Sequence, residues 1–279
     1  MPQRCVIYGN CQGTALDIFL RFSPEFARLF TPCVHSNWQQ TPFPLEQLED
    51  CALFLYQPTK DRGGLAPSTE AMLDALPPHC VRVAFPYVYF NGYWPFHTDS
   101  PHTDVGRAFP KERHYYADSV LDKLAATPLP VERILNIYRN LDFEEEHPAA
   151  ERLRETLRIQ REREERTDIK SADLIEAAYR TEHIFLTVRH PSNTMYLRTS
   201  NRLLRLLGLP LLPDRVAVAA PSPYNVPYAH PIHPGLARVL GLEFVTDRTR
   251  YNLWGDWFDY EAYLRDYIEN RRLLQALAA

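Results

Sequence analysis

Short apolar runs alternate with helical patterns through the first 85 residues, and this alternation constrains the fold more than any other feature. The runs end at polar or turn-forming residues, which is typical of strands buried on both faces. They are residues 5–8, 29–34, 52–56 and 81–85. Between them, one helical pattern starts near Cys11 and a second covers residues 69–76. We therefore predict a parallel sheet with helices on both faces, a three-layer, doubly wound α/β fold.

The composition is that of a globular protein with one sizeable core. Of the 279 residues, 45% are hydrophobic and 24% charged, so we expect a single α/β domain over residues 1–279. The 24 prolines against 10 glycines indicate long, shaped loops. With 31 basic and 35 acidic residues the formal net charge is −4. No global basic field is therefore available to hold nucleic acid or an anionic membrane.

Cysteine usage and the length of the apolar runs indicate a reducing, aqueous compartment. The five cysteines show no CxxC spacing, which argues against a disulfide framework and against a zinc or other metal site. No run approaches about 18 consecutive apolar residues, and the N-terminal residues lack the apolar stretch of a signal peptide. We expect a cytoplasmic protein with no integral membrane segment, in which Cys5, Cys51 and Cys80 are inert buried residues.

An aromatic stretch at residues 87–96 follows the fourth predicted strand. It reads YVYFNGYWPF and is followed by four polar residues, His97, Asp99, His102 and Asp104. The segment is too polar and too interrupted by proline for a regular element. It either covers a ligand or is a well-packed surface loop.

The second half of the chain is mainly helical. Residues 131–180 are predicted to form a helical insertion or cap, in which residues 151–166 are so charged that only Leu153, Leu157 and Ile159 can face a core. Residues 183–188 then predict a returning buried strand, followed by a helix over residues 193–207 that Gly208 stops. From about residue 259, a last helical pattern is expected to dock on the body of the protein. Its apolar residues are Tyr263, Leu264, Tyr267, Ile268 and Leu274.

The turn Gly9-Asn10-Cys11-Gln12-Gly13 is the strongest chemical signal. It follows the first predicted strand and opens the first helix, where backbone N–H groups converge and the helix dipole is positive. Such a position lowers the pKa of a thiol, and the same N–H groups can hold a tetrahedral oxyanion. The alternative is a glycine-rich turn with an incidental cysteine, or a phosphate cradle. The turn does not match a Walker motif, so binding of a nucleoside triphosphate is poorly supported.

A thiol nucleophile needs a base, and His190 is the best candidate. It ends the predicted strand at residues 183–188 and precedes Pro191 at an edge where α/β sheets present their sites. The rivals are four loop histidines, of which the two in His-Pro pairs more often only shape a loop. They are His230, His233, His97 and His102.

Together these features resemble the WcbI family of polysaccharide-biosynthesis acetyltransferases. The resemblance rests on the Gly-Asn-Cys-Gln-Gly turn, the Phe-Asn-Gly-Tyr-Trp-Pro stretch, the strand ending in His190-Pro191 and the Tyr/Trp-rich C-terminal segment. It implies a fold related to SGNH hydrolases and flavodoxin-like sheets, binding of coenzyme A or acetyl-CoA as co-substrate, and O-acetylation of a sugar hydroxyl in capsule or a related glycan.

The resemblance also implies roles for individual residues. Cys11 takes the place of the SGNH serine and His190 that of the base. Thr187 stands where SGNH enzymes have an aspartate, so a Cys-His dyad is expected. The turn residues, with Gln57 and Asn91 after the third and fourth strands, are the candidates for holding an oxyanion or substrate. Candidates for holding the cofactor are Arg189, Asn193 and Arg198.

Three alternatives remain open at this point. Transfer can proceed through an acyl-cysteine or directly to the sugar. An SGNH-like esterase or thioesterase would use water as the acceptor. A non-catalytic protein that binds coenzyme A or a glycan would keep the turn as an anion cradle. The sequence does not identify the acceptor sugar, the acyl chain or the residues that hold the adenine end of coenzyme A. It also leaves open whether the protein forms a homo-oligomer.

Overall fold

The computed structural model describes residues 1–37, 43–59, 67–100, 113–224 and 228–278. The chain divides into two compact units, each made of three segments. Unit 1 contains Met1–Val88, Ile159–Glu176 and Pro191–Asn225, and unit 2 contains Tyr89–Arg158, Ala177–His190 and Val226–Ala279. His102 and Asp104 of the aromatic region lie outside the described residues.

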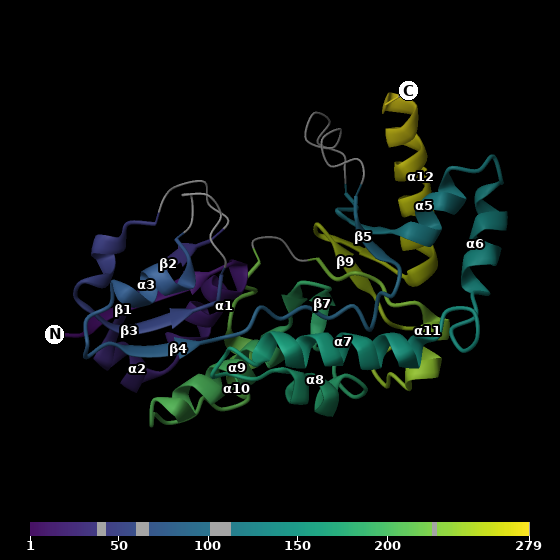
Figure 1. Ribbon diagram of the computed structural model, residues 1–279. Helices are drawn as coiled ribbons and strands as arrows, with labels where there is room; N and C mark the ends of the chain where they lie inside the picture. Colours follow the sequence, from purple (N-terminus) through teal and green to yellow (C-terminus); the bar gives the residue numbers. More distant parts are fainter. Residues whose placement is uncertain (38–42, 60–66, 101–112, 225–227, 279) are drawn as a thin grey trace. The chain divides into compact units, whose positions relative to one another are not determined.

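Unit 1 is built on the predicted parallel sheet. Its four strands are β1 (Gln3–Gly9), β2 (Phe30–Ser36), β3 (Cys51–Tyr56) and β4 (Val81–Ala84). They lie in the order β2-β1-β3-β4, and every neighbouring pair is parallel (Figure 1). The predicted runs differ from these strands by two residues or fewer at each end, because strands buried on both faces are nearly continuous apolar runs.

Helices cover both faces of this sheet. On one face, Cys5 and Ile7 of β1 pack with α1 (Cys11–Leu20) and α9 (Asn193–Leu206). On the other face, Val6 and Tyr8 pack with α3 (Thr69–Asp74) and the 3₁₀ turn η1 (Leu45–Leu48). Successive side chains of a strand point to opposite faces, so β1 contributes to both cores. The predicted α/β fold with a parallel sheet is therefore confirmed, and its relation to SGNH hydrolases and flavodoxin-like sheets remains a prediction.

The remaining helices of unit 1 are short. Helix α2 (Pro24–Leu29) follows α1, with Ser23 as its N-cap and Pro24 in its first turn. Helix α10 (Arg215–Ala219) packs on α9. Gly208 follows the end of α9. Its φ is 70°, a left-handed conformation that glycine adopts without strain.

Unit 2 combines helices with small antiparallel hairpins. Strands β5 (His97–Asp99) and β6 (Tyr116–Asp118) pair with each other, as do β9 (Tyr251–Leu253) and β10 (Asp256–Phe258). The helices are α5 (Ser119–Ala125), α6 (Val131–Arg139), α11 (Pro234–Leu240) and α12 (Tyr260–Ala278) (Figure 1). As predicted, the apolar residues of the C-terminal helix are buried; they pack against α5 and α6. The hairpins were not predicted.

Residues 131–180 are helical, as predicted, and also contain α7 (Ala149–Glu164) and α8 (Ala172–Ala178). They contribute to both units, and their description as an insertion in one domain remains a prediction. Leu153 and Leu157 are buried, whereas Ile159 is only partly buried. The expectation that apolar residues alone face inward was wrong, because Thr156, Gln160 and Glu164 are buried too and are hydrogen-bonded.

The predicted strand at residues 183–188 is not part of the parallel sheet. Only β7 (Phe185–Thr187) is extended, and it pairs with β8 (His190–Pro191). The backbone groups beside it bond elsewhere: Phe90 N donates to Val188 O, and His230 N donates to Leu186 O. Phe185 stacks on Phe90 with 5.1 Å between ring centroids. The segment is apolar because it packs under loops of unit 2.

Across the described ranges, no helix is both long and apolar enough to cross a membrane.

Candidate active site

Cys11 begins α1 at the carboxyl edge of the parallel sheet, directly after β1. The chain leaves β1 toward β2 on one side, while β3 lies on the other side of β1. In open α/β sheets such a reversal creates the crevice where ligands bind. Cys11 is partly exposed, whereas Cys5, Cys51 and Cys80 are buried, as predicted. The most promising thiol of the sequence therefore stands where this fold class presents its chemistry.

Hydrogen bonds within the protein fix the turn around Cys11. Asn10 caps α1 by accepting a bond from Gln12 N to Oδ1 at 2.9 Å. Gly13 N donates to Asn10 O at 2.9 Å, and Asn10 N donates to Gln57 Oε1 at 2.8 Å. These three N–H groups already have protein acceptors, which favours a structural role for them. Their role in holding an oxyanion stays a prediction.

Two buried glutamines, Gln12 and Gln57, hold this turn through side-chain hydrogen bonds. Gln57 Nε2 donates to Gln12 Oε1 and to Pro86 O, both at 3.3 Å. Gln12 in turn donates from Nε2 to Val88 O at 2.7 Å and accepts from Val88 N at 2.9 Å. The two side chains thus connect the ends of β1, β3 and β4. Gln57 was predicted to assist an oxyanion, but its amide is engaged in positioning the turn.

Glycine at position 9 is required by this close packing. A Cβ atom on Gly9 would lie 2.9 Å from Gln57 Oε1 and 3.0 Å from Phe85 Cζ. A Cβ on Gly13 would lie 3.4 Å or more from its neighbours, which is ordinary contact with little room to spare. Gly9 lets Gln57 approach the backbone and bind Asn10.

Helix α9 brings two predicted cofactor residues into unit 1. Asn193 Nδ2 donates to Ala217 O and Ala220 O at 3.1 and 2.9 Å, which ties α9 to α10. Arg198, one turn further on, is partly buried. Tyr196 of the same helix lies near Cys11: burial, and to a smaller extent the Cys11 thiol, raise the pKa of Tyr196. Binding of a cofactor by Asn193 and Arg198 remains a prediction.

His190 lies in unit 2, in contact with a tyrosine from β6. Tyr116 Oη is 3.3 Å from His190 Nδ1, and the two rings are edge to face. Burial, and secondarily the Arg189 guanidinium, lower the pKa of His190 to about 4. The imidazole is therefore neutral at pH 7, the form that accepts a proton. Thr187 is fully buried and accepts a bond from Arg189 N at 3.3 Å.

Tyr116 is a residue that sequence reasoning missed. Its ring centroid lies 5.6 Å from that of His97 and 6.4 Å from that of His230, so it contacts two of the four predicted rivals of His190. It belongs to a three-residue strand 74 positions before His190, and nothing in the local pattern marks it. A phenol contacts the imidazole at the atom where a triad would place a carboxylate.

Three of the rival histidines, His97, His230 and His233, lie in the described part of the chain, and each is at least partly buried. His233 caps α11, accepting from Gly235 N at 2.9 Å, and its Nε2 lies 2.9 Å from Tyr138 O, so both ring nitrogens are engaged. Burial lowers the pKa of His97 to about 4. His230 is buried, and its Nδ1 has no hydrogen-bond partner among the described residues.

The other two predicted site residues of unit 2 bind to protein groups. Arg189 forms an ion pair with Asp99 through Nη2, at 2.9 and 3.1 Å from its two carboxylate oxygens. Asn91 Oδ1 accepts a short hydrogen bond from Thr156 Oγ1 of α7. Cys11 and His190 thus belong to different units, and their pairing stays a prediction, as do the ligand roles of Arg189 and Asn91.

Another cysteine of unit 1, Cys33, has its thiol beside an imidazole. Cys33 Sγ and His35 Nε2 are 3.4 Å apart on β2, and both residues are partly exposed. His35 Nε2 is closer to Gln47 Oε1, at 2.7 Å, and Cys33 lies within a strand rather than at a helix N-terminus. Cys33 is therefore a natural control for Cys11.

Comparison with known proteins decides the family. The family model of the polysaccharide biosynthesis enzyme WcbI matches residues 4–212. This range is most of the chain and nearly all of the parallel sheet. The chain belongs to the WcbI family of polysaccharide biosynthesis enzymes. The predicted resemblance is therefore confirmed. No curated protein matches the chain.

A solved WcbI structure has the same fold. It superposes with a TM-score of 0.74 over 99% of this chain and 93% of the other, at 20% sequence identity. That protein is described as a novel polysaccharide biosynthesis enzyme, in a native form without a disulfide bond between coenzyme A and one of its cysteines. The description links coenzyme A to a cysteine in that member of the WcbI family.

Proposed function

We propose that this protein is an O-acetyltransferase that uses acetyl-CoA and acts on a sugar hydroxyl of a polysaccharide through Cys11 and His190. The observation that carries the proposal is the position of Cys11, partly exposed in the first turn of α1 at the carboxyl edge of the sheet. There the helix dipole stabilises a thiolate. Membership of the WcbI family supports the polysaccharide, and the solved relative, a form without a disulfide bond between coenzyme A and a cysteine, supports coenzyme A as the carrier of the acetyl group.

The proposed reaction passes through an acetyl-cysteine. His190 takes the Cys11 proton, and Sγ attacks the thioester carbonyl carbon. Cleavage of the thioester C–S bond then releases coenzyme A, which takes the proton from His190. A sugar hydroxyl gives its proton to His190 as its oxygen attacks the acetyl carbon, and the Cys11 thiolate leaves and is reprotonated. His190 is unprotonated at pH 7, as each half requires at its start, and its lowered pKa makes it a weaker base than a free imidazole.

Each supporting residue has a task in this scheme. Gln12 and Gln57 hold the turn and so fix the direction of Sγ, and Asn10 caps the helix that stabilises the thiolate. Tyr116 positions the His190 ring through Nδ1. Precise positioning of a nucleophile and its base is worth several orders of magnitude in rate.

The test is an acetyl-transfer assay with purified protein. Acetyl-CoA is incubated with oligosaccharides released from the source organism's surface polysaccharide, and free coenzyme A and acetylated sugar are measured in parallel. We expect both products from the wild type, and neither above background from Cys11→Ala or His190→Ala. Release of coenzyme A without acetylated sugar would instead identify a thioesterase. Binding of coenzyme A with no release would identify a binding protein.

A further inference from the structure

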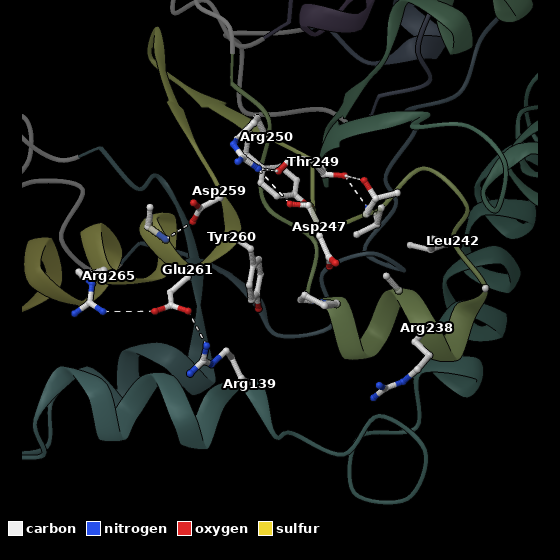
Figure 2. Close-up of a pocket in the computed structure, with 17 residues that line it drawn as sticks. Arg139, Arg238, Leu242, Asp247, Thr249, Arg250, Asp259, Tyr260, Glu261 and Arg265 are labelled. Carbon is white, nitrogen blue, oxygen red and sulfur yellow. Dashed lines mark hydrogen bonds and ion pairs between the residues drawn. The ribbon is translucent and has the colours of Figure 1, made fainter.

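Unit 2 contains a pocket that none of the predicted site residues lines. It encloses about 830 Å³ between the end of α6, the helix α11 and its following loop, and the first turn of α12. All of its lining residues belong to unit 2. Its volume is within the range of about 300–1,000 Å³ that is usual for small-molecule sites. Figure 2 shows Arg250 and Thr249 on one side of the lining residues and Arg139 and Arg238 on the other side. Tyr260 and Asp247 lie between them.

Half of the positive charge at this pocket is neutralised by neighbouring carboxylates. Arg139 forms an ion pair with Glu261 at 2.6 Å, and Arg265 reaches Glu261 at 3.6 Å (Figure 2). Arg265 also pairs with Glu132 at 2.7 Å. These two arginines and two glutamates form a closed network. Arg139, Glu261 and Arg265 line the pocket, but because they are paired they are not free charges for a ligand.

The other charged groups at the pocket are balanced as well, but they are less engaged. Among the described residues, Arg250 Nη1 donates to just two acceptors, the backbone oxygens of Asp247 and Thr249, at 3.3 and 3.1 Å. The Arg238 side chain has no hydrogen bond or ion pair with the residues that the structure describes, and the residue is exposed. Asp247 and Asp259 supply two carboxylates, of which Asp259 caps α12 through Ala262 N at 2.8 Å. Outside the ion-pair network, the pocket thus offers two guanidinium groups, of Arg238 and Arg250, and two carboxylates, of Asp247 and Asp259.

This balance selects among ligand classes. A ligand rich in phosphate would gain from Arg238 and Arg250 but would be repelled by Asp247 and Asp259. A sugar ring, in contrast, carries several hydroxyls that each donate and accept, so it is matched by donors and acceptors placed together. Thr246 and Thr249 also line the pocket, but their hydroxyls bond to each other and to backbone groups of the same loop, so they shape the wall. The charged rim disfavours a purely apolar ligand.

Tyr260 adds a buried group that lacks a protein partner. Its ring lines the pocket, and its hydroxyl is buried with no hydrogen-bond partner in the described part of the chain. Burial raises the pKa of Tyr260, so the hydroxyl stays protonated and can donate. Because the hydroxyl has essentially no accessible surface, a ligand in the pocket meets the ring of Tyr260 and not its oxygen.

We propose that this pocket in unit 2 binds a sugar unit of the glycan that the enzyme acetylates. The inference rests on the proposed function for the identity of the glycan. Asp247 and Arg250 are the residues that bind hydroxyls, and Tyr260 is a wall of the site. All three act in binding and take no part in the chemistry at Cys11.

Saturation-transfer NMR with oligosaccharides from the source organism's surface polysaccharide tests this assignment. We expect sugar signals with the wild-type protein, and a dissociation constant at least about tenfold higher for Asp247→Asn and Arg250→Ala, as for loss of a hydrogen bond to a charged group. Arg248→Ala is the matched control, because Arg248 is exposed on the same loop but does not line the pocket. All three side chains are exposed, so the variants should fold, and melting curves verify this.

The same samples are titrated with coenzyme A, and acetylation of Cys11 is followed by mass. The inference is overturned if no oligosaccharide binds, if both variants bind it like the wild type, or if they lose coenzyme A instead. If sugar binding behaves as expected while Cys11 is never acetylated, the proposed reaction fails and the sugar site stands. If Cys11 is acetylated but the variants bind the sugar normally, only the sugar site fails.

Discussion

At the residue scale, the contact between Tyr116 and His190 is the feature most open to direct test. Tyr116→Phe removes the hydroxyl that lies 3.3 Å from His190 Nδ1 but keeps the ring that packs among His97, His190 and His230. We expect kcat to fall by up to about tenfold, the value of one lost hydrogen bond, with the KM for acetyl-CoA unchanged. Tyr115→Phe is the control, since Tyr115 is exposed. Equal kcat values for both variants would contradict the positioning role.

The two glycines that flank Cys11 give a second prediction at this scale. Gly9→Ala places a Cβ 2.9 Å from Gln57 Oε1, so the glutamine must move, and we expect the free energy of unfolding to fall by about 1–3 kcal/mol. Gly13→Ala meets Ile7 at 3.4 Å inside a helix, where alanine is preferred, and should change stability by less than about 1 kcal/mol. Urea denaturation measures both, and a Gly13 variant as unstable as the Gly9 variant would contradict this account.

At the element scale, a buried carboxylate explains how a helix as charged as α7 is joined to α8. Glu164 Oε1 accepts from Ser171 N and Ala172 N at 2.7 and 3.1 Å, at the start of α8, and from Gln160 Nε2 at 2.9 Å. We expect Glu164→Ala to lower the free energy of unfolding by about 1–3 kcal/mol, because buried donors lose their acceptor. Glu165→Ala, on an exposed neighbour, should leave it nearly unchanged. Urea denaturation of the two variants decides.

The elements also show which parts of the structure the sequence could predict. β1, β3 and the start of α1 were predictable because burial on two faces and the turn at Cys11 are local patterns. The strand at Phe185 was misplaced because an apolar run does not reveal whether its partners are strands or loops. Tyr116 could not be found, since only the tertiary fold brings its hydroxyl to His190. The pocket around Tyr260 joins separate helices and has no local signature.

At the scale of the whole molecule, buried neutral histidines should make the protein sensitive to acid. Burial lowers the pKa of His97, His183, His190 and His233 to about 4 from the ordinary value of 6.5. Between these values the unfolded chain binds protons that the folded chain does not, so stability falls as the pH drops through this window. Asp118, with a pKa raised to about 6 by burial, acts in the opposite direction but is a single group. We expect a lower urea midpoint at pH 5 than at pH 7.5; equal midpoints would contradict this.

The central claim, that Cys11 carries the acetyl group, is tested most directly by intact-protein mass spectrometry after brief exposure to acetyl-CoA without acceptor. The account predicts a mass increase of one acetyl group in the wild type and in Cys33→Ala, the variant that removes the thiol beside His35. The increase should be absent from Cys11→Ala. An adduct that persists in Cys11→Ala, or that disappears in Cys33→Ala, would contradict the assignment. If coenzyme A binds and no adduct forms, the acetyl-cysteine mechanism is wrong.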